Sequence, residues 1–171
     1  MSHSVRLFVI LFVFFLLPYH SSEAVQKFTR SQAYGDWVLN CSKESDPEIK
    51  TSESCSLHQQ VMTEKGARLL SVSIATVSKR EEKIASFSLP LGFYIPDGVK
   101  ITVGKGKTRR LLVTMCTQKG CFAEIILDKE LSRELSLGKK LKLALLTGDR
   151  VKNLDFSVSL KGISVGLRSV K

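Results

Sequence analysis

The chain has few of the residues from which catalytic and metal sites are usually built. Of its 171 residues only three are histidines and one is tryptophan, and His3 and His20 lie in an apolar N-terminal segment. A Ser-His-Asp triad or a histidine-based metal site would therefore depend on His58 alone. His58 stands in the alternating stretch that follows Cys55, where a histidine is usually solvated or hydrogen bonded. Because no phosphate-binding loop is present either, the sequence predicts no catalytic residue, no cofactor and no metal.

The chain also lacks an apolar run long enough to span a bilayer. Residues 7–17 form a run of eleven apolar residues, whereas a membrane helix needs roughly 20. The run follows a positively charged start and precedes the small residues Ser22 and Ala24, which is the pattern of a secretory signal peptide. We expect cleavage after Ala24, so that residues 1–24 are the signal peptide and the mature chain does not span the membrane. The alternative, an uncleaved anchor, is disfavoured by the short run.

No cysteine occurs in the expected signal peptide, and all four, Cys41, Cys55, Cys116 and Cys121, lie in the part that we expect to be exported. Thiols outside the cytosol are oxidised, so an even number of cysteines predicts two disulfides, for which three pairings exist. Neither Cys-x4-Cys nor Cys-x13-Cys is a common zinc spacing, and a thioredoxin-type centre needs Cys-x-x-Cys. We therefore expect a structural role for all four cysteines.

Local strand patterns favour one of the three pairings. Residues 110–115 and 122–127 have the composition of strands and the intervening "TQKG" that of a turn, which predicts a hairpin. Cys116 and Cys121 then face each other across its mouth, where Cβ atoms are about 4.5 to 5.5 Å apart. Likewise, Cys41 ends the strand-like "YGDWVLNC", and Cys55 opens "CSLHQQVM". We predict the bridges Cys41–Cys55 and Cys116–Cys121.

Most of residues 25–171 alternate between apolar and polar side chains, with the period of two that marks half-buried strands. Short turn signals such as "PDG" and "GKGK" separate these stretches. Because no linker or repeat divides this part, it predicts one all-β domain, an antiparallel β-sandwich or barrel-like domain. Residues 127–138 instead repeat leucine every four positions and predict one short helix. We expect Trp37, the only tryptophan, in the core.

Five stretches of the chain carry a family resemblance: "YGDWVLNC", the second cysteine followed by "SLHQQV", "LPLGFYIPDGVKI", the Cys-x4-Cys hairpin with Gly120 before its second cysteine, and the closing "SLKGISVGL". Together they resemble the invasion-associated locus B family of exported alphaproteobacterial proteins. The resemblance covers nearly all of the mature chain, with order and spacing kept. It implies a disulfide-bonded β-rich domain linked, in pathogenic members, with entry into host cells. It supplies no catalytic residues.

The charge of the mature chain is unevenly distributed. Residues 101–171 contain 15 basic and 6 acidic residues, a net charge of +9, whereas residues 25–100 contain 10 and 9, a net charge of +1. Clustered lysine and arginine attract anionic partners. The candidates for anion binding are Lys105, Lys107, Arg109, Arg110, Lys119, Lys139, Lys140 and the nearby Lys142. A basic surface also keeps a β protein soluble and its strand edges unpaired, and the sequence does not decide between the two roles.

The expected partners follow from the expected location. Outside the cytoplasm an anionic partner would be lipopolysaccharide, an anionic phospholipid surface or a sulfated glycan of a host cell. Nucleic acid is not expected, because no aromatic platform or recognition motif accompanies the basic residues. The sequence thus predicts an exported, non-enzymatic protein of the cell envelope or host interface, in the periplasm, on the outer surface or secreted. The alternative is a periplasmic envelope stress or assembly factor that binds bacterial components.

Overall fold

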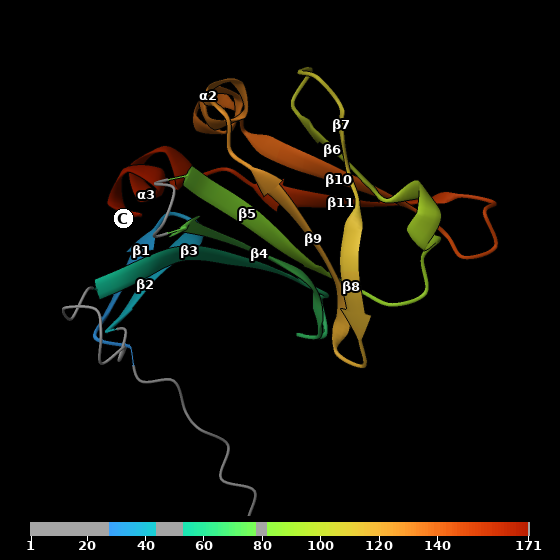
Figure 1. Cartoon of the computed structure of the whole chain (residues 1–171), viewed down its shortest axis with the longest axis horizontal. Helices are drawn as coiled ribbons and strands as arrows, with labels where there is room; N and C mark the ends of the chain where they lie inside the picture. The colour runs from blue at the N-terminus through green and yellow to red at the C-terminus, as the bar shows by residue number, and fades with distance from the viewer. Residues whose placement is uncertain (1–27, 44–52, 78–81, 171) are drawn as a thin grey trace, which may run out of the picture.

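The computed structural model describes residues 28–43, 53–77 and 82–170, and the expected signal peptide, residues 1–24, lies outside these ranges. The described residues form two antiparallel sheets and two α-helices (Figure 1). The predicted all-β sandwich is confirmed, and the two sheets are open rather than joined into a barrel. In the described part, no helix is long and apolar enough to cross a bilayer.

The larger sheet has seven strands in the order β1-β2-β3-β4-β5-β9-β8. Neighbouring strands are antiparallel throughout. The strands are β1 (Arg30–Tyr34), β2 (Trp37–Lys43), β3 (Glu53–Met62), β4 (Arg68–Val77), β5 (Glu82–Leu89), β8 (Val113–Thr117) and β9 (Gly120–Ile126). Their inward positions carry the predicted alternation, since Leu70, Val72 and Ile74 on β4 are buried while the residues between them are half-buried.

The smaller sheet has four strands in the order β11-β10-β6-β7. They are β6 (Val99–Val103), β7 (Arg109–Leu111), β10 (Lys140–Leu146) and β11 (Asn153–Ser159), with the 3-10 turn η2 (Ile95–Asp97) before β6. The chain passes from β7 in the smaller sheet to β8 in the larger one through the single residue Leu112. The expectation of one strand over residues 110–115 is therefore wrong, because this stretch is shared between the sheets.

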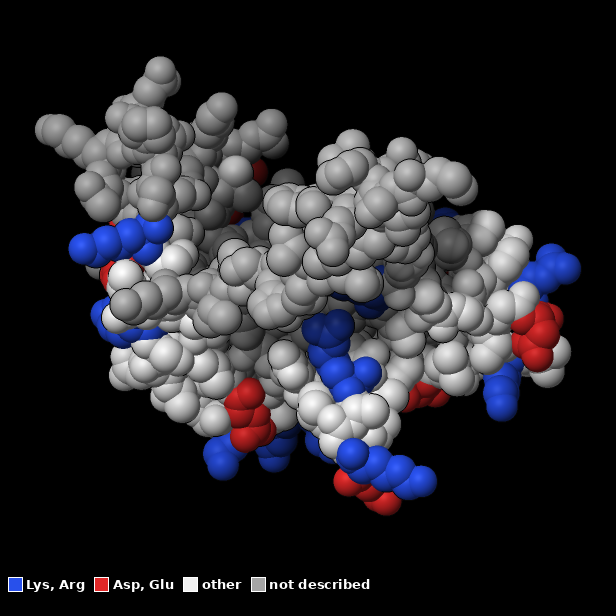
Figure 2. All heavy atoms as spheres, turned by 90° about the horizontal axis from the view of Figure 1, so that it is seen from below, with Lys and Arg blue, Asp and Glu red and all other residues white. Residues whose placement is uncertain are grey.

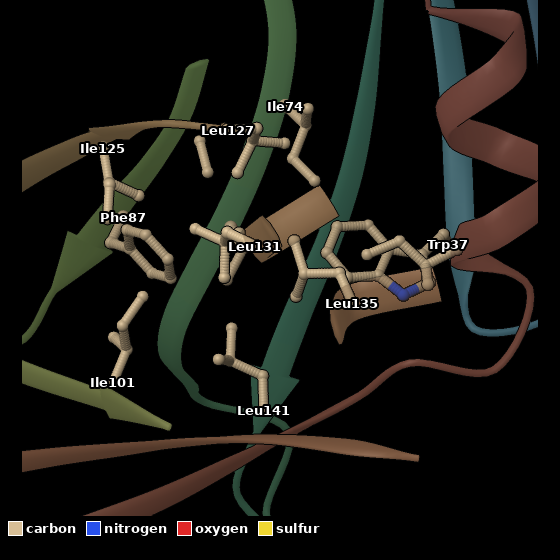
Figure 3. A pocket seen from close by; sticks show the side chains of 12 residues that line it. Trp37, Ile74, Phe87, Ile101, Ile125, Leu127, Leu131, Leu135 and Leu141 are labelled. Carbon is tan, nitrogen blue, oxygen red and sulfur yellow. The ribbon is translucent and has the colours of Figure 1, made fainter. Parts of the chain in front are cut away.

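The two sheets enclose one continuous apolar core (Figure 3). Trp37 is fully buried in it, as predicted, and its indole Nε1–H donates to the carbonyl oxygen of Ser159 at 2.9 Å. In Figure 3 the side chains of Phe87, Ile101 and Leu141 converge from both sheets on a remaining space of about 10 Å³. A space of that size holds one water at most, so the interior is a packed core and not a ligand cavity.

The predicted helix is present as α2 (Lys129–Leu137), which connects β9 of the larger sheet to β10 of the smaller. The Asp128 side chain caps it by accepting the backbone N–H of Leu131 at 2.7 Å. Leu131 and Leu135 are buried, and Figure 3 shows their side chains among those that line the core between the sheets. The apolar stripe of α2 thus closes one end of the sandwich.

The prediction of a single helix was wrong, because the described residues contain a second one, α3 (Ile163–Ser169). It packs against β1, β2 and β3. Gly162 precedes it with a φ of 90°, and a Cβ there would collide with the carbonyl of Tyr34, so the tight junction requires glycine. Seven residues are too few for a clear helical periodicity, which is why the sequence pattern does not reveal α3.

Both disulfides have the predicted pairing and join residues directly opposite each other on neighbouring strands. The Cα–Cα distance is 4.0 Å in each. Two details of the sequence interpretation change. The β8–β9 turn is shorter than expected, because Thr117 and Gly120 pair and leave only Gln118 and Lys119. The stretch "YGDWVLNC" is not one strand, because Gly35 and Asp36 form the turn between β1 and β2.

We predict that the two bridges contribute unequally to stability. Cys41–Cys55 closes a 14-residue separation and both cysteines are buried, whereas Cys116–Cys121 closes a separation of five at a hairpin end with Cys116 exposed. On the loop-entropy model the losses are about 3 and about 2 kcal/mol. The double variant Cys41→Ser/Cys55→Ser should therefore unfold at a lower denaturant concentration than Cys116→Ser/Cys121→Ser. Equal midpoints would contradict the argument.

Candidate functional site

Within the described ranges, one group of three side chains has the proximity of a metal site: Cys41, Glu53 and Cys55. The sulfurs of Cys41 and Cys55 are bonded to each other. A disulfide sulfur is not the thiolate that zinc or a similar ion requires. This group is a structural bridge with a neighbouring carboxylate.

His58 lies on the outer face of the larger sheet, away from the core. Its Nε2 is 2.6 Å from the hydroxyl oxygen of Ser56, and its cross-strand neighbours are Val38 and Ser73. The hydrogen bonds of this pair include no carboxylate in the part of the chain that the structure describes. A nucleophilic triad would need such a carboxylate to orient the imidazole. A polar groove of about 510 Å³ surrounds the pair, lined by the serine side chains of β2, β3 and β4.

The basic residues that the sequence singled out do not form one cluster. The register of the sheets decides their places. β9 ends and β10 begins beside α2, and the start of β10 pairs with the end of β6, so the β6–β7 turn lies at the α2 end of the molecule. Lys105 and Lys107 in this turn, together with Lys139 and Lys140 after α2, are exposed there. We call these four lysines the basic end.

Lys119 lies at the opposite end of the molecule. It is in the β8–β9 turn, and Cys121 at the start of β9 pairs with Leu89 at the end of β5. Figure 1 shows this turn at the bottom of the view, with α2 and the β6–β7 turn at the top. Lys119 therefore does not contribute to the basic end, although only a short stretch of sequence separates it from Lys107.

Arg109 and Arg110 are held in contacts within the protein. Arg109 donates to the carboxylate oxygens of Glu134 at 2.6 Å and Glu130 at 3.0 Å, and its side chain is only 11% exposed. Chiefly the hydrogen bond to Glu134 raises the pKa of Arg109 above its already high ordinary value. Arg110 donates to the backbone carbonyls of Pro96 and Asp97. Both arginines thus fasten β7 to its neighbours.

The ion pairs of Arg109 join β7 to α2 and so place the β6–β7 turn beside the helix. A groove of about 460 Å³ lies between them. Val103 and Gly104 line it from the turn side, and Arg133 and Leu137 line it from the helix side. Sequence reasoning missed this groove. The signal that could have found it is Leu137, a leucine of the helix that departs from the four-residue spacing of the buried stripe.

The side opposite α2 carries a different distribution of charge. Figure 2 views the molecule from below Figure 1, and its Lys and Arg side chains stand at separate places, most of them beside Asp or Glu. Charges of both signs that alternate in this way cancel over a few ångströms in salt solution. On this side Lys and Arg are therefore interspersed with Asp and Glu, whereas the basic end gathers four exposed lysines.

Comparison with known proteins identifies the family. Residues 37–171 match the sequence profile of the family described as "Invasion associated locus B (IalB) protein". The chain belongs to the invasion-associated locus B family. The family resemblance read from the sequence is thereby confirmed.

Two known proteins are similar to this chain. The protein named "Invasion protein B" of Bartonella bacilliformis is 26% identical over 116 residues, which are 67% of this chain and 59% of that protein's length. The crystal structure of invasion associated protein b from Bartonella henselae superposes with a TM-score of 0.73 at 24% identity, covering 82% of this chain and 94% of that one. The second likeness shows a shared fold.

We predict that His58 makes stability depend on pH. Burial lowers the pKa of His58 below its ordinary value of 6.5. The unfolded chain then binds more protons than the folded protein, so the stability linked to His58 is complete above pH 6.5 and is lost as the pH falls through the lowered pKa. In thermal melts the advantage of the wild type over His58→Gln should therefore shrink between about pH 7.5 and about pH 5. Parallel curves for the two proteins would contradict this.

Proposed function

We propose that the mature chain is an exported, non-enzymatic protein of the cell envelope or host interface, which acts by binding an anionic surface through its basic end. The observation that carries this proposal is the gathering of Lys105, Lys107, Lys139 and Lys140 at one end of the molecule, with their side chains exposed. Exposed lysines held on two adjoining turns attract a polyanion at long range and dock to it with little rearrangement.

Three further observations support the proposal. Two disulfides in a small domain are typical of proteins that work outside the cytosol. The names of the family and of the Bartonella bacilliformis relative associate this fold with invasion. The hydrogen-bonded pair of Ser56 and His58 includes no carboxylate in the described ranges, which favours binding over hydrolysis.

The test is salt-dependent retention of the mature protein on immobilised heparin, a sulfated polyanion. The variant Lys105→Gln/Lys107→Gln/Lys139→Gln should elute at a clearly lower salt concentration than the wild type, because exposed charges act through a field that salt screens over about 8 Å. Its melting temperature should stay nearly unchanged, since all three side chains are exposed.

A matched control removes the same charge from the opposite end. Lys65, Lys119 and Lys152 are exposed residues of the β3–β4, β8–β9 and β10–β11 turns, which lie away from α2. Replacement of these three by glutamine should shift elution much less. Equal shifts for the two triple variants would mean that retention follows net charge alone, and the proposal would fail.

Fractionation addresses the location. An envelope or host-interface role requires the processed chain in the periplasm, on the outer surface or in the medium. Recovery of the unprocessed chain in the cytoplasm, with reduced cysteines, would contradict the proposal.

A further inference from the structure

An exposed leucine lies beside the basic end. α2 buries Leu131 and Leu135, but Leu137 in its last turn is 75% exposed. Gly138, the residue after Leu137, packs closely against the sandwich, because a Cβ at Gly138 would collide with Val103 and crowd Leu160. The helix end is therefore seated tightly on the sandwich, and the Leu137 side chain is held outside the core.

The neighbouring β6–β7 turn is fixed beside this leucine. The N–H of Gly104 donates to the carbonyl of Lys140 at 3.2 Å, and the Arg109–Glu134 ion pair spans from β7 to the helix. Gly106 lies against Glu134, where an added Cβ would come within 3.1 Å of the carboxylate. Lys105 and Leu137 consequently line the same groove, together with Arg133 of the helix.

We propose that the basic end docks on a bilayer that contains anionic phospholipids, with Leu137 entering the interface and the four lysines contacting lipid phosphates. The inference rests on the proposed function and names the surface. A sulfated glycan has no apolar phase to receive a leucine, whereas the headgroup boundary of a bilayer takes apolar side chains and attracts the lysines around them.

The expected binding is weak and needs both components. One leucine gives only a modest partition into the interface, of the order of tenfold. Each lysine near an anionic membrane surface adds about fivefold. Binding should therefore be strong enough to measure on anionic vesicles at low salt, fall as salt rises, and be absent on neutral vesicles.

The test is co-sedimentation of the mature protein with vesicles of phosphatidylglycerol and phosphatidylcholine in equal amounts, and with phosphatidylcholine alone. Leu137→Ser should weaken binding to the anionic vesicles about tenfold. The matched control is Val151→Ser in the β10–β11 turn, at the opposite end, because Val151 is 78% exposed. This control should bind like the wild type. Equal binding of all three proteins would overturn the inference.

A second variant tests insertion by tryptophan fluorescence. Trp37 is fully buried, so its emission is not expected to respond to vesicles, and Leu137→Trp introduces a single reporter at the proposed contact. Its emission should shift to the blue when anionic vesicles are added and stay unchanged with phosphatidylcholine. An unshifted spectrum on vesicles that sediment the protein would overturn insertion.

Different experimental results would contradict this inference and the proposed function. On heparin, Leu137→Ser should elute with the wild type, because only charge is involved there. If the lysine variant loses heparin retention while Leu137→Ser retains full vesicle binding, the basic end binds polyanions without insertion. If the lysine variant keeps its heparin retention, the proposed function itself is wrong.

Discussion

The packing of Leu131 and Leu135 between the two sheets determines how the rest of the molecule is arranged. The sheets meet face to face through their apolar inner sides, and at one end the strands alone leave this core open. α2 covers that end because its two buried leucines lie four residues apart on one face. The chain segments on either side of the helix, β9 and β10, are thereby assigned to different sheets.

The placement of α2 has an electrostatic consequence. The helix carries Glu130 and Glu134 one turn apart, and these would repel each other if they were unpaired. Arg109 of β7 stands between them and neutralises part of their charge, and the 20% exposure of the Glu134 side chain makes this contact less screened than a surface pair. Because Arg109 is paired with α2, the β6–β7 turn before it lies beside the helix. Lys105 and Lys107 of this turn therefore lie at the same end of the molecule as the two lysines that follow the helix.

The sequence predicts the local features of this fold more fully than the relations between distant ones. Alternation over Leu70, Val72 and Ile74 indicates both the strand and its buried face, and cysteines that face each other across neighbouring strands indicate their pairing. The change of sheet at Leu112 leaves no mark in the pattern, since a strand that continues and a strand that crosses both alternate. The sequence pattern does not reveal the basic end either. Along the chain Lys107 is nearer to Lys119 than to Lys139, whereas in the fold it lies at the same end as Lys139 and at the opposite end from Lys119.

The asymmetry of charge bears on how the molecule would be oriented at a surface. In the proposed docking, the four exposed lysines of the basic end turn this end toward an anionic surface before contact. The turns β3–β4, β8–β9 and β10–β11 then point away from that surface, and the serine-lined outer face of the larger sheet with His58 stands at its side. In the proposed docking that face remains open to solvent, because the contact is made by α2, the β6–β7 turn and the start of β10. The rigid connection of the basic end to the core through Gly138 and Arg109 means that docking fixes the orientation of the entire sandwich.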